Sequence, residues 1–116
     1  MFEVLRGDMK KGVVELDDRL LKKVAEKICE DELKRDILLE LDGKSLIEMA
    51  EVYKSLKKRN EDISYSKFFV RIRTLTDSGL IRKVKLGKMG VGNVVFLELT
   101  DKGRKIVELI RGSLKS

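Results

Sequence analysis

The sequence predicts an α+β fold that is mainly helical and has a two-stranded β-hairpin in its C-terminal half. Three observations lead to this prediction. Apolar residues recur at helical spacing through residues 65–77, and alternating apolar and polar residues lie on both sides of the glycine-rich segment 87–92. The phrase Thr100-Asp-Lys-Gly103 then opens a last amphipathic segment. With 116 residues, 42% of them hydrophobic, the chain is long enough for one compact domain.

The composition is rich in charge. Charged residues make up 40% of the chain, against about a quarter in an average protein, and Pro, Trp, His and Gln are absent. Many Lys, Arg and Glu residues with few amides are the trend of hyperthermophile proteins. We therefore expect a thermophilic, archaeal source.

The N-terminal third predicts an arm and two helices. Residues 2–16 alternate in part, which indicates either a short hairpin or an irregular arm. Asp17 or Asp18 is placed to cap a helix that runs to about Cys29. The apolar stripe of this helix consists of Leu20, Leu21, Val24 and Ile28. Asp31 or Glu32 begins a second helix, Leu33 to Leu41, which Asp42-Gly43 closes.

A third helix is expected to start at Ser45, because Ser45 and Glu48 have the spacing of a capping box. Its apolar stripe consists of Leu46, Met49, Ala50, Tyr53 and Leu56. The helix ends in the basic turn 57–60, which suits the negative end of the helix dipole.

The fourth helix, residues 65–77, follows Ser64 as its N-cap. Its core side consists of Phe68, Ile72 and Leu75, continued by Leu80. The opposite face presents Ser66, Val70, Arg73, Thr74 and Asp77, with Lys67 and Arg71 beside it and Phe69 and Thr76 on the border. Strands are expected over 82–86 and 93–99, and a last helix over 102–112.

Positive charge is concentrated in the second half of the chain. The net charge is +6 with a pI near 9.5. Residues 1–41 hold 9 basic and 11 acidic side chains, whereas residues 54–88 hold 11 basic and 3 acidic ones. A localised basic face is typical of proteins that bind polyanions. The alternative is an ordinary solvated surface on a protein rich in charge.

Several function classes are disfavoured. Without histidine, the chain cannot use histidine-dependent triads, and one cysteine, Cys29, cannot form a structural zinc site or an intramolecular disulfide. Cys29 is best explained as a small core residue, with an intermolecular redox role as the alternative. The glycines of segment 87–92 lie between two strands, which favours a hairpin turn over a phosphate-binding loop. We expect no enzyme activity, no cofactor and no metal.

No signal-peptide core or membrane-spanning apolar run is present, so we expect a cytoplasmic protein without a membrane partner.

The stretch from Asp31 to Arg111 resembles winged-helix transcriptional regulators of the MarR, PadR and ArsR group, especially small archaeal members. The resemblance rests on Ser45–Glu51 as the first helix of the motif, Ser64–Ile81 as the recognition helix with its turn, and Leu99-Thr-Asp-Lys-Gly103 after the wing. It implies a winged helix-turn-helix with a C-terminal hairpin wing at residues 85–93. The metal ligands of the ArsR type are missing, and the chain stops soon after Arg111, before the long final helix of the PadR type.

The resemblance divides the chain into residues 1–30, an arm and helix for dimerisation, and residues 31–112, a winged-helix DNA-binding domain. It implies a homodimer formed through helices 18–29 and 102–112. We therefore expect a sequence-specific regulator of transcription that binds double-stranded DNA, with helix 65–77 in the major groove and the wing on the backbone or in the minor groove. The alternative is a winged-helix protein–protein interaction module, in which Phe69, Phe96 and Met89 would form an apolar patch.

The residues expected to contact DNA are basic or short polar side chains of the helix-turn-helix and the wing. They are Lys44, Ser45, Lys57, Lys58, Arg59, Tyr65, Ser66, Lys67, Val70, Arg71, Arg73, Thr74, Lys85 and Lys88. Among them, Ser45 is expected to bind a phosphate together with the first amides of its helix, and Val70 to contact a thymine methyl group.

Overall fold

A computed structural model of the chain describes residues 18–88 and 92–115. Five helices and three strands follow one another in these residues. Their bounds are α1 Asp18–Cys29, α2 Glu32–Leu41, β1 Ile47–Glu48, α3 Met49–Arg59, α4 Tyr65–Asp77, β2 Ile81–Lys88, β3 Gly92–Leu99 and α5 Asp101–Lys115. The predicted α+β class, mainly helical with a C-terminal hairpin, is confirmed. The expected arm at residues 2–16 and the centre of the glycine-rich turn lie outside the described residues.

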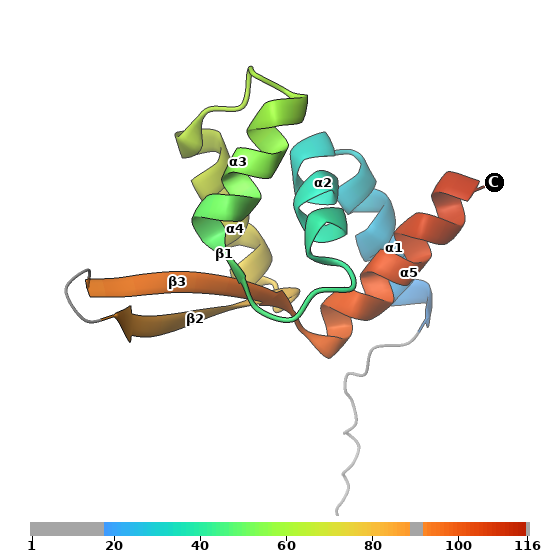
Figure 1. The fold of residues 1–116 in the computed structure, drawn as a ribbon. Helices are drawn as coiled ribbons and strands as arrows, with labels where there is room; N and C mark the ends of the chain where they lie inside the picture. Colours follow the sequence, from blue (N-terminus) through green and yellow to red (C-terminus); the bar gives the residue numbers. More distant parts are fainter. Residues whose placement is uncertain (1–17, 89–91, 116) are drawn as a thin grey trace, which may run out of the picture.

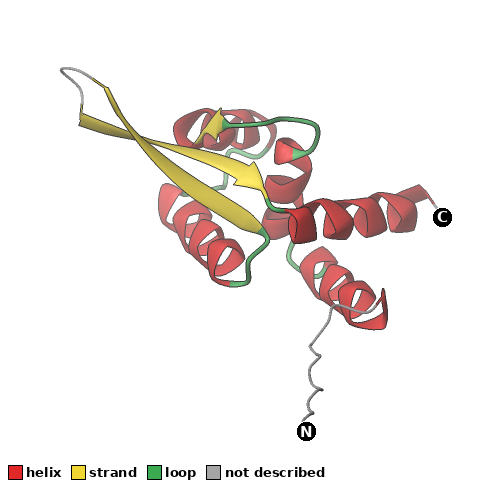
Figure 2. Ribbon diagram, turned by 90° about the horizontal axis from the view of Figure 1, so that it is seen from below, coloured by secondary structure: helices red, strands yellow, loops and turns green. Residues whose placement is uncertain are grey.

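The helices form one body, and the β2–β3 hairpin extends from it (Figure 1). Helices α1 and α5 lie side by side at one end, α3 and α4 form the other end, and α2 lies between them. Figure 2 shows the same hairpin from below, reaching past the edge of the helices. Within residues 18–88 and 92–115, no helix combines the length and the hydropathy of a membrane span.

Phe68, Ile72, Leu75 and Leu80 are all buried, as their helical spacing predicted. They pack with apolar side chains from every helix and from β3, and burying one such side chain contributes about 1.5–3 kcal/mol. The largest fully buried side chains elsewhere are Ile37, Leu38, Leu41, Leu56, Ile81, Leu97, Ile106 and Ile110. This core fixes α4 on α2 and at the base of the hairpin, so the opposite face of α4 is left outward.

Three predicted helix ends are confirmed by their hydrogen bonds and dihedral angles. Asp31 caps α2 by accepting a bond from the backbone N–H of Lys34 at 3.1 Å. Ser64 caps α4 in the same way, from the N–H of Lys67 at 3.2 Å. Gly43 follows α2 with φ +77°, the left-handed conformation that glycine adopts without strain.

The prediction that the third helix starts at Ser45 is wrong. Helix α3 starts at Met49, and its N-cap, Glu48, makes no side-chain capping bond. Instead, Ile47 and Glu48 form β1, which pairs antiparallel with Leu97 and Phe96 of β3. Pairing with β3 gives the backbone N–H and C=O groups of this segment hydrogen-bond partners, and it covers an edge of the sheet. A local capping box would cover no sheet edge.

The hairpin is therefore part of a three-stranded sheet with the order β1-β3-β2, rather than an isolated pair. The register of β2 and β3 runs from Ile81 opposite Leu99 to Lys88 opposite Gly92. The strands and the last helix are also longer than expected. Leu46, which was assigned to the apolar stripe of the third helix, is 44% exposed and precedes β1.

The phrase Thr100-Asp-Lys-Gly103 ties the start of α5 to the turn between α4 and β2. The Thr100 hydroxyl donates to the carbonyl of Gly79 at 2.6 Å, and the Thr100 N–H donates to the carbonyl of Leu80 at 3.1 Å. The Gly103 N–H in turn donates to the Thr100 hydroxyl at 3.0 Å. Gly103 lies so close to Leu80 that a Cβ atom there would be 2.0 Å from the Leu80 carbonyl oxygen. The glycine is therefore required by a close approach of two backbones.

Candidate nucleic-acid interface

The outward face of α4 is built from the residues that the helical spacing assigned to it. Ser66, Val70, Arg73, Thr74 and Asp77 are all exposed, and Val70 is 54% exposed. Most are short side chains, so a helix face of this kind can approach another surface closely. Arg73 adds one long cationic side chain to it.

Hydroxyl groups along this helix bond to its own backbone. Thr74 donates from Oγ1 to the Val70 carbonyl at 3.0 Å, and Ser78 donates to the Thr74 carbonyl at 2.5 Å. A hydroxyl bonded four residues back is less available to an outside acceptor. The methyl group of Thr74 and the acceptor lone pairs of its oxygen then remain for outside contacts.

An aromatic cluster lies beside the first turn of α4. Tyr65 makes an edge contact with Tyr53, with ring centroids 5.3 Å apart, and stacks on Phe69 at 6.1 Å. The Lys83 ammonium, from β2, lies 5.8 Å from the centroid of the Phe69 ring. Lys83 therefore joins the hairpin to α4 by a cation–π contact.

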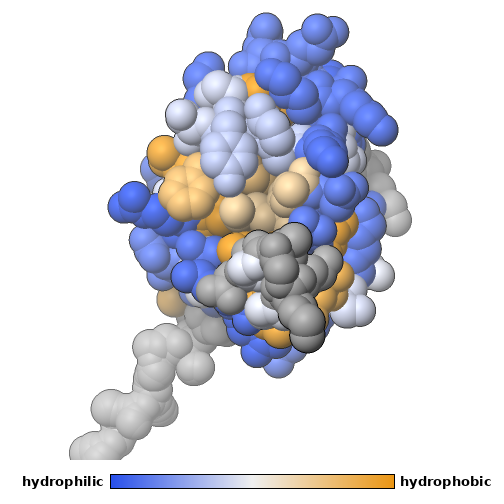
Figure 3. Space-filling model, turned by 60° about the vertical axis from the view of Figure 1, so that its left-hand side comes forward, coloured by the Kyte–Doolittle hydropathy of each residue, from blue (hydrophilic) through white to orange (hydrophobic). Residues whose placement is uncertain are grey.

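The same face has an apolar area between α4, the start of α3 and the hairpin. Tyr65 and Phe69 are 49% and 37% exposed. Next to Tyr65 is a hollow of about 220 Å³ lined by Glu48, Met49, Ala50, Tyr65, Val94 and Val95. Figure 3 shows apolar side chains on this side of the molecule, bordered by hydrophilic ones.

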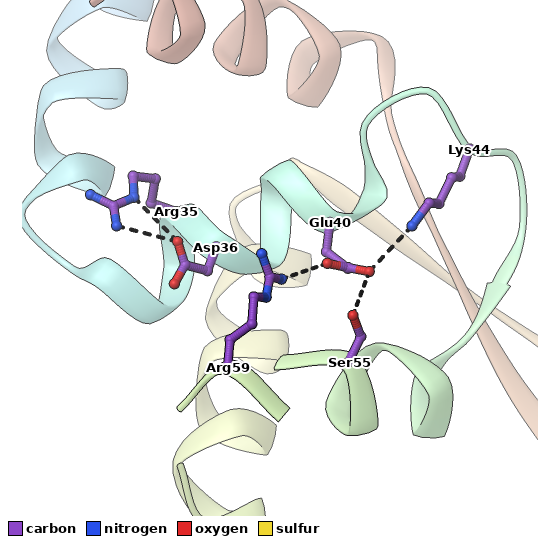
Figure 4. Close-up of polar contacts among 6 residues, drawn as sticks. All are labelled: Arg35, Asp36, Glu40, Lys44, Ser55 and Arg59. Carbon is purple, nitrogen blue, oxygen red and sulfur yellow. Dashed lines mark hydrogen bonds and ion pairs between the residues drawn. The ribbon is translucent and has the colours of Figure 1, made fainter. Parts of the chain in front are cut away.

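Two of the basic residues expected at the interface converge on Glu40 of α2 (Figure 4). Arg59 donates to one carboxylate oxygen at 2.6 Å, while Lys44 and the Ser55 hydroxyl donate to the other at 3.2 and 2.9 Å. Figure 4 also shows the neighbouring pair of Arg35 and Asp36 on α2, which does not touch this cluster. Because one carboxylate serves two cations, the cluster of Glu40, Lys44 and Arg59 has a net charge of +1.

Burial of Glu40 would by itself raise its pKa. The hydrogen bonds from Ser55 and Lys44 and the charges of Lys44 and Arg59 outweigh burial, and together they lower the pKa of Glu40. The Glu40 side chain, only 13% exposed, therefore remains ionised and links α2 to α3.

Two further basic residues of the expected set make bonds within the helix-turn-helix. The Lys57 ammonium donates to the carbonyls of Glu61 and Ile63, both at 2.8 Å, and so closes the turn between α3 and α4. Arg71 pairs with Asp31 at 3.3 Å, on the side of α4 that meets α2. The Arg71–Asp31 pair has no net charge, whereas Lys57 keeps its charge.

The remaining members of the expected set are exposed wherever the structure describes their side chains. Ser45 lies ahead of β1, so it is not part of a helix N-terminus. Lys58 is in the last turn of α3, Lys67 in the first turn of α4, and Lys85 on β2. Lys88 ends β2, and its side chain lies outside the described part of the chain.

Sequence reasoning missed several parts of this surface. It did not predict the contact of Lys83 with Phe69 or the hollow at Tyr65, since both depend on how the helices meet the hairpin. Leu86 of β2 is 45% exposed, because the hairpin has left the helices by that point (Figure 1). Of the three residues proposed for an apolar patch, Phe69 is exposed, Phe96 is half-buried and Met89 lies outside the described residues.

A groove of about 500 Å³ lies between α1 and α5, at the end of the molecule remote from α4. Ala25 and Cys29 line it from α1, and Leu109 and Ile110 from α5. Cys29 is only half-buried, so it is less of a core residue than expected. Among residues 18–88 and 92–115, no group of three or more His, Cys, Asp or Glu residues could hold a metal ion.

No protein-family model matches this sequence, and no curated protein matches it. Solved structures do match the fold. A PadR family transcription regulator from Clostridium difficile R20291 matches with a TM-score of 0.64 at 17% identity, over 72% of this chain and 86% of its own. A structure described as a MarR-family transcriptional regulator from Porphyromonas gingivalis W83 matches with a TM-score of 0.65 at 19% identity, over 89% and 94%.

A transcriptional regulator homologue from Pyrococcus horikoshii OT3 matches with a TM-score of 0.63 at 22% identity, over 82% of this chain and 90% of its own. The chain has the winged-helix fold. The resemblance to PadR- and MarR-type regulators is thus confirmed in structure. Within this fold, α3 and α4 form the helix-turn-helix and the β2–β3 hairpin is the wing.

Proposed function

We propose that this chain is a sequence-specific, double-stranded DNA-binding regulator of transcription, without enzyme activity. The observation that carries the proposal is the outward face of the recognition helix, where short side chains and Arg73 are exposed with basic side chains on both sides. The structural neighbours are described as transcription regulators, which supports the same function. Fold alone does not fix function, so the proposal rests mainly on this face.

In the proposed complex, α4 enters the major groove and reads base edges. Arg73 is suited to the O6 and N7 acceptors of guanine, and Ser66 to a base edge or a phosphate. Val70 provides an apolar contact, and Tyr65 covers the sugar–phosphate backbone at the start of the helix. The wing follows the backbone or enters the minor groove.

We assign phosphate contacts first to Lys58 at the end of α3, Lys67 in the first turn of α4, and Lys85 and Lys88 on the wing. The positive charges of Lys57, Lys44 and Arg59 also attract DNA, although these side chains already make contacts within the protein. Arg71 contributes least, because Asp31 neutralises it. The expected phosphate site at Ser45 is not kept, since no helix starts there.

We propose a homodimer, because two half-sites read by two recognition helices give a winged-helix regulator its specificity. The groove between α1 and α5 is the suggested contact, since Leu109 and Ala25 make its lining apolar. Analytical ultracentrifugation of wild type and Leu109→Glu tests this. A monomer at every concentration would contradict it.

The proposed function is tested by fluorescence anisotropy of a labelled generic duplex, titrated with protein at several salt concentrations. We expect an affinity that falls log-linearly with salt, with a slope of about 0.9 per phosphate contact. Lys58→Ala or Lys85→Ala should reduce the slope by about one unit, and Lys23→Ala on α1 should not change it. No binding at low salt would refute the proposal.

One observation favours a second candidate, a protein–protein interaction module. Tyr65, Phe69 and Val70 are large exposed apolar side chains on one helix, next to a hollow. Exposed apolar patches often mark protein partners. This module would bind no duplex even at low salt, so the same titration separates the two functions.

A further inference from the structure

We propose that the recognition helix selects DNA through the C5-methyl groups of two nearby thymines, using Val70 and the methyl group of Thr74. This inference rests on the proposed function and extends it to the chemical class of base that is read. In the major groove, the thymine methyl is the apolar feature that distinguishes A·T from the other base pairs.

Val70 provides the first apolar contact. Its side chain is 54% exposed, the highest value among the large exposed apolar residues of the described chain. It lies at the middle of α4, on the face opposite the buried Phe68 and Ile72. Burying an exposed apolar side chain against another apolar surface is favourable, because both surfaces leave water.

Thr74 provides the second contact because its hydroxyl is already used. Oγ1 donates to the Val70 carbonyl at 3.0 Å, so the side chain is held by its own helix. Thr74 is exposed and has no free donor in its side chain, so we assign its contact with DNA to the methyl group. For Thr74 to donate a hydrogen bond to a base, that bond would have to break, whereas its oxygen could still accept one.

The two contacts have a spacing that fits neighbouring bases. Residues four apart on a helix have Cβ atoms about 5–6 Å apart. Successive bases on one DNA strand rise by about 3.4 Å. Val70 and Thr74 can therefore meet two methyl groups within a window of about three base pairs.

The test compares thymine with uracil, which differs from it only by the missing C5-methyl group. The probe is the duplex enriched from a random-sequence library by the full-length wild-type protein, then synthesised with deoxythymidine or with deoxyuridine. Burial of one methyl group corresponds to roughly a fourfold change in affinity. We expect wild type to bind the uracil duplex more weakly, by at least about tenfold for two contacts.

Two variants remove one contact each without disturbing the helix. Thr74→Ser keeps the hydroxyl that bonds to the Val70 carbonyl and removes only the methyl. Val70→Ala shortens an exposed side chain to a better helix former. Each should reduce the discrimination between the two duplexes to about fourfold. The control Leu20→Ala changes an exposed apolar side chain on α1 and should keep the full discrimination.

Equal affinity of wild type for the two duplexes would overturn the inference and leave the proposed function standing. Discrimination that stays unchanged in both variants would also overturn it, because other residues would then contact the methyl groups. Failure to enrich or bind any duplex would instead refute the proposed function itself.

Discussion

Replacing Gly103 by alanine places a methyl group where the fold has no room for one. The new Cβ would lie 2.0 Å from the Leu80 carbonyl oxygen and 3.3 Å from the Leu99 side chain, and real Cβ contacts shorter than 3.0 Å essentially do not occur. Helix α5 and the turn before β2 must therefore separate by about 1 Å. The Leu80 carbonyl cannot move freely, because it accepts bonds from the Thr100 N–H at 3.1 Å and from the Thr100 hydroxyl at 3.2 Å.

The expected cost follows from these contacts. Overpacking a tight site costs about 1–3 kcal/mol, and weakening each buried hydrogen bond costs about 1 kcal/mol more. Alanine recovers at most about 1 kcal/mol through its better helix propensity. We therefore expect Gly103→Ala to lower the free energy of unfolding by about 2–4 kcal/mol.

Gly112 supplies the matched control in the same helix. A Cβ added there would meet nothing within 4 Å, so Gly112→Ala should gain about 0.5–1 kcal/mol from helix propensity. Thermal unfolding followed by circular dichroism should place the two variants about 10–20 °C apart in Tm, at about 4 °C per kcal/mol. A Gly103→Ala variant that melts at or above the temperature of wild type would refute the reasoning.

Three further predictions concern the helix-turn-helix. Glu40→Gln should cost about 1 kcal/mol at pH 7, discounted for its half-exposed partners, whereas Glu51→Gln should change little. Because folding lowers the pKa of Glu40, the contribution of its carboxylate to stability is complete above about pH 4.5 and is lost as the pH falls through the lower pKa of the folded state. The difference in stability between wild type and Glu40→Gln, measured by urea unfolding, should therefore disappear at acid pH. Ser64→Ala should cost about 1 kcal/mol by removing the α4 cap, which urea unfolding measures; a loss under about 0.3 kcal/mol would contradict this role. Arg71→Ala should lower the Tm but change DNA affinity by less than about twofold, against about tenfold for Arg73→Ala, and the reverse order in the anisotropy assay would contradict the assignment.

Local signals in the sequence were sufficient for most elements. The side-chain caps of α2 and α4 act within three residues of Asp31 and Ser64, and the buried face of α4 follows from helical spacing alone. Such signals need no knowledge of the rest of the chain. The outward face of α4, and with it the main part of the candidate site, could be predicted for the same reason.

Features that depend on distant residues could not be predicted. The start of α3 was displaced by the pairing of Ile47 with Leu97, a partner from the other half of the chain. The capping box at Ser45 is an equally valid local signal, but the backbone of residues 47–48 pairs with β3 instead of forming the first turn of a helix. Arg71 was assigned to DNA for its place on the helix, and its partner Asp31 is 40 residues away. A single sequence gives no indication of such pairings.

The pairing of α1 with α5 has a consequence for biosynthesis. The buried stripe of α1, Leu21, Ala25 and Ile28, packs largely against a helix that begins more than 70 residues after α1 ends. At about 5–20 residues per second, the ribosome needs roughly 4–14 s to reach α5 after completing α1. During that interval the stripe is only partly covered, by α2, on the nascent chain. A chaperone that binds amphipathic helices can therefore bind α1 until α5 is synthesised and packs against it.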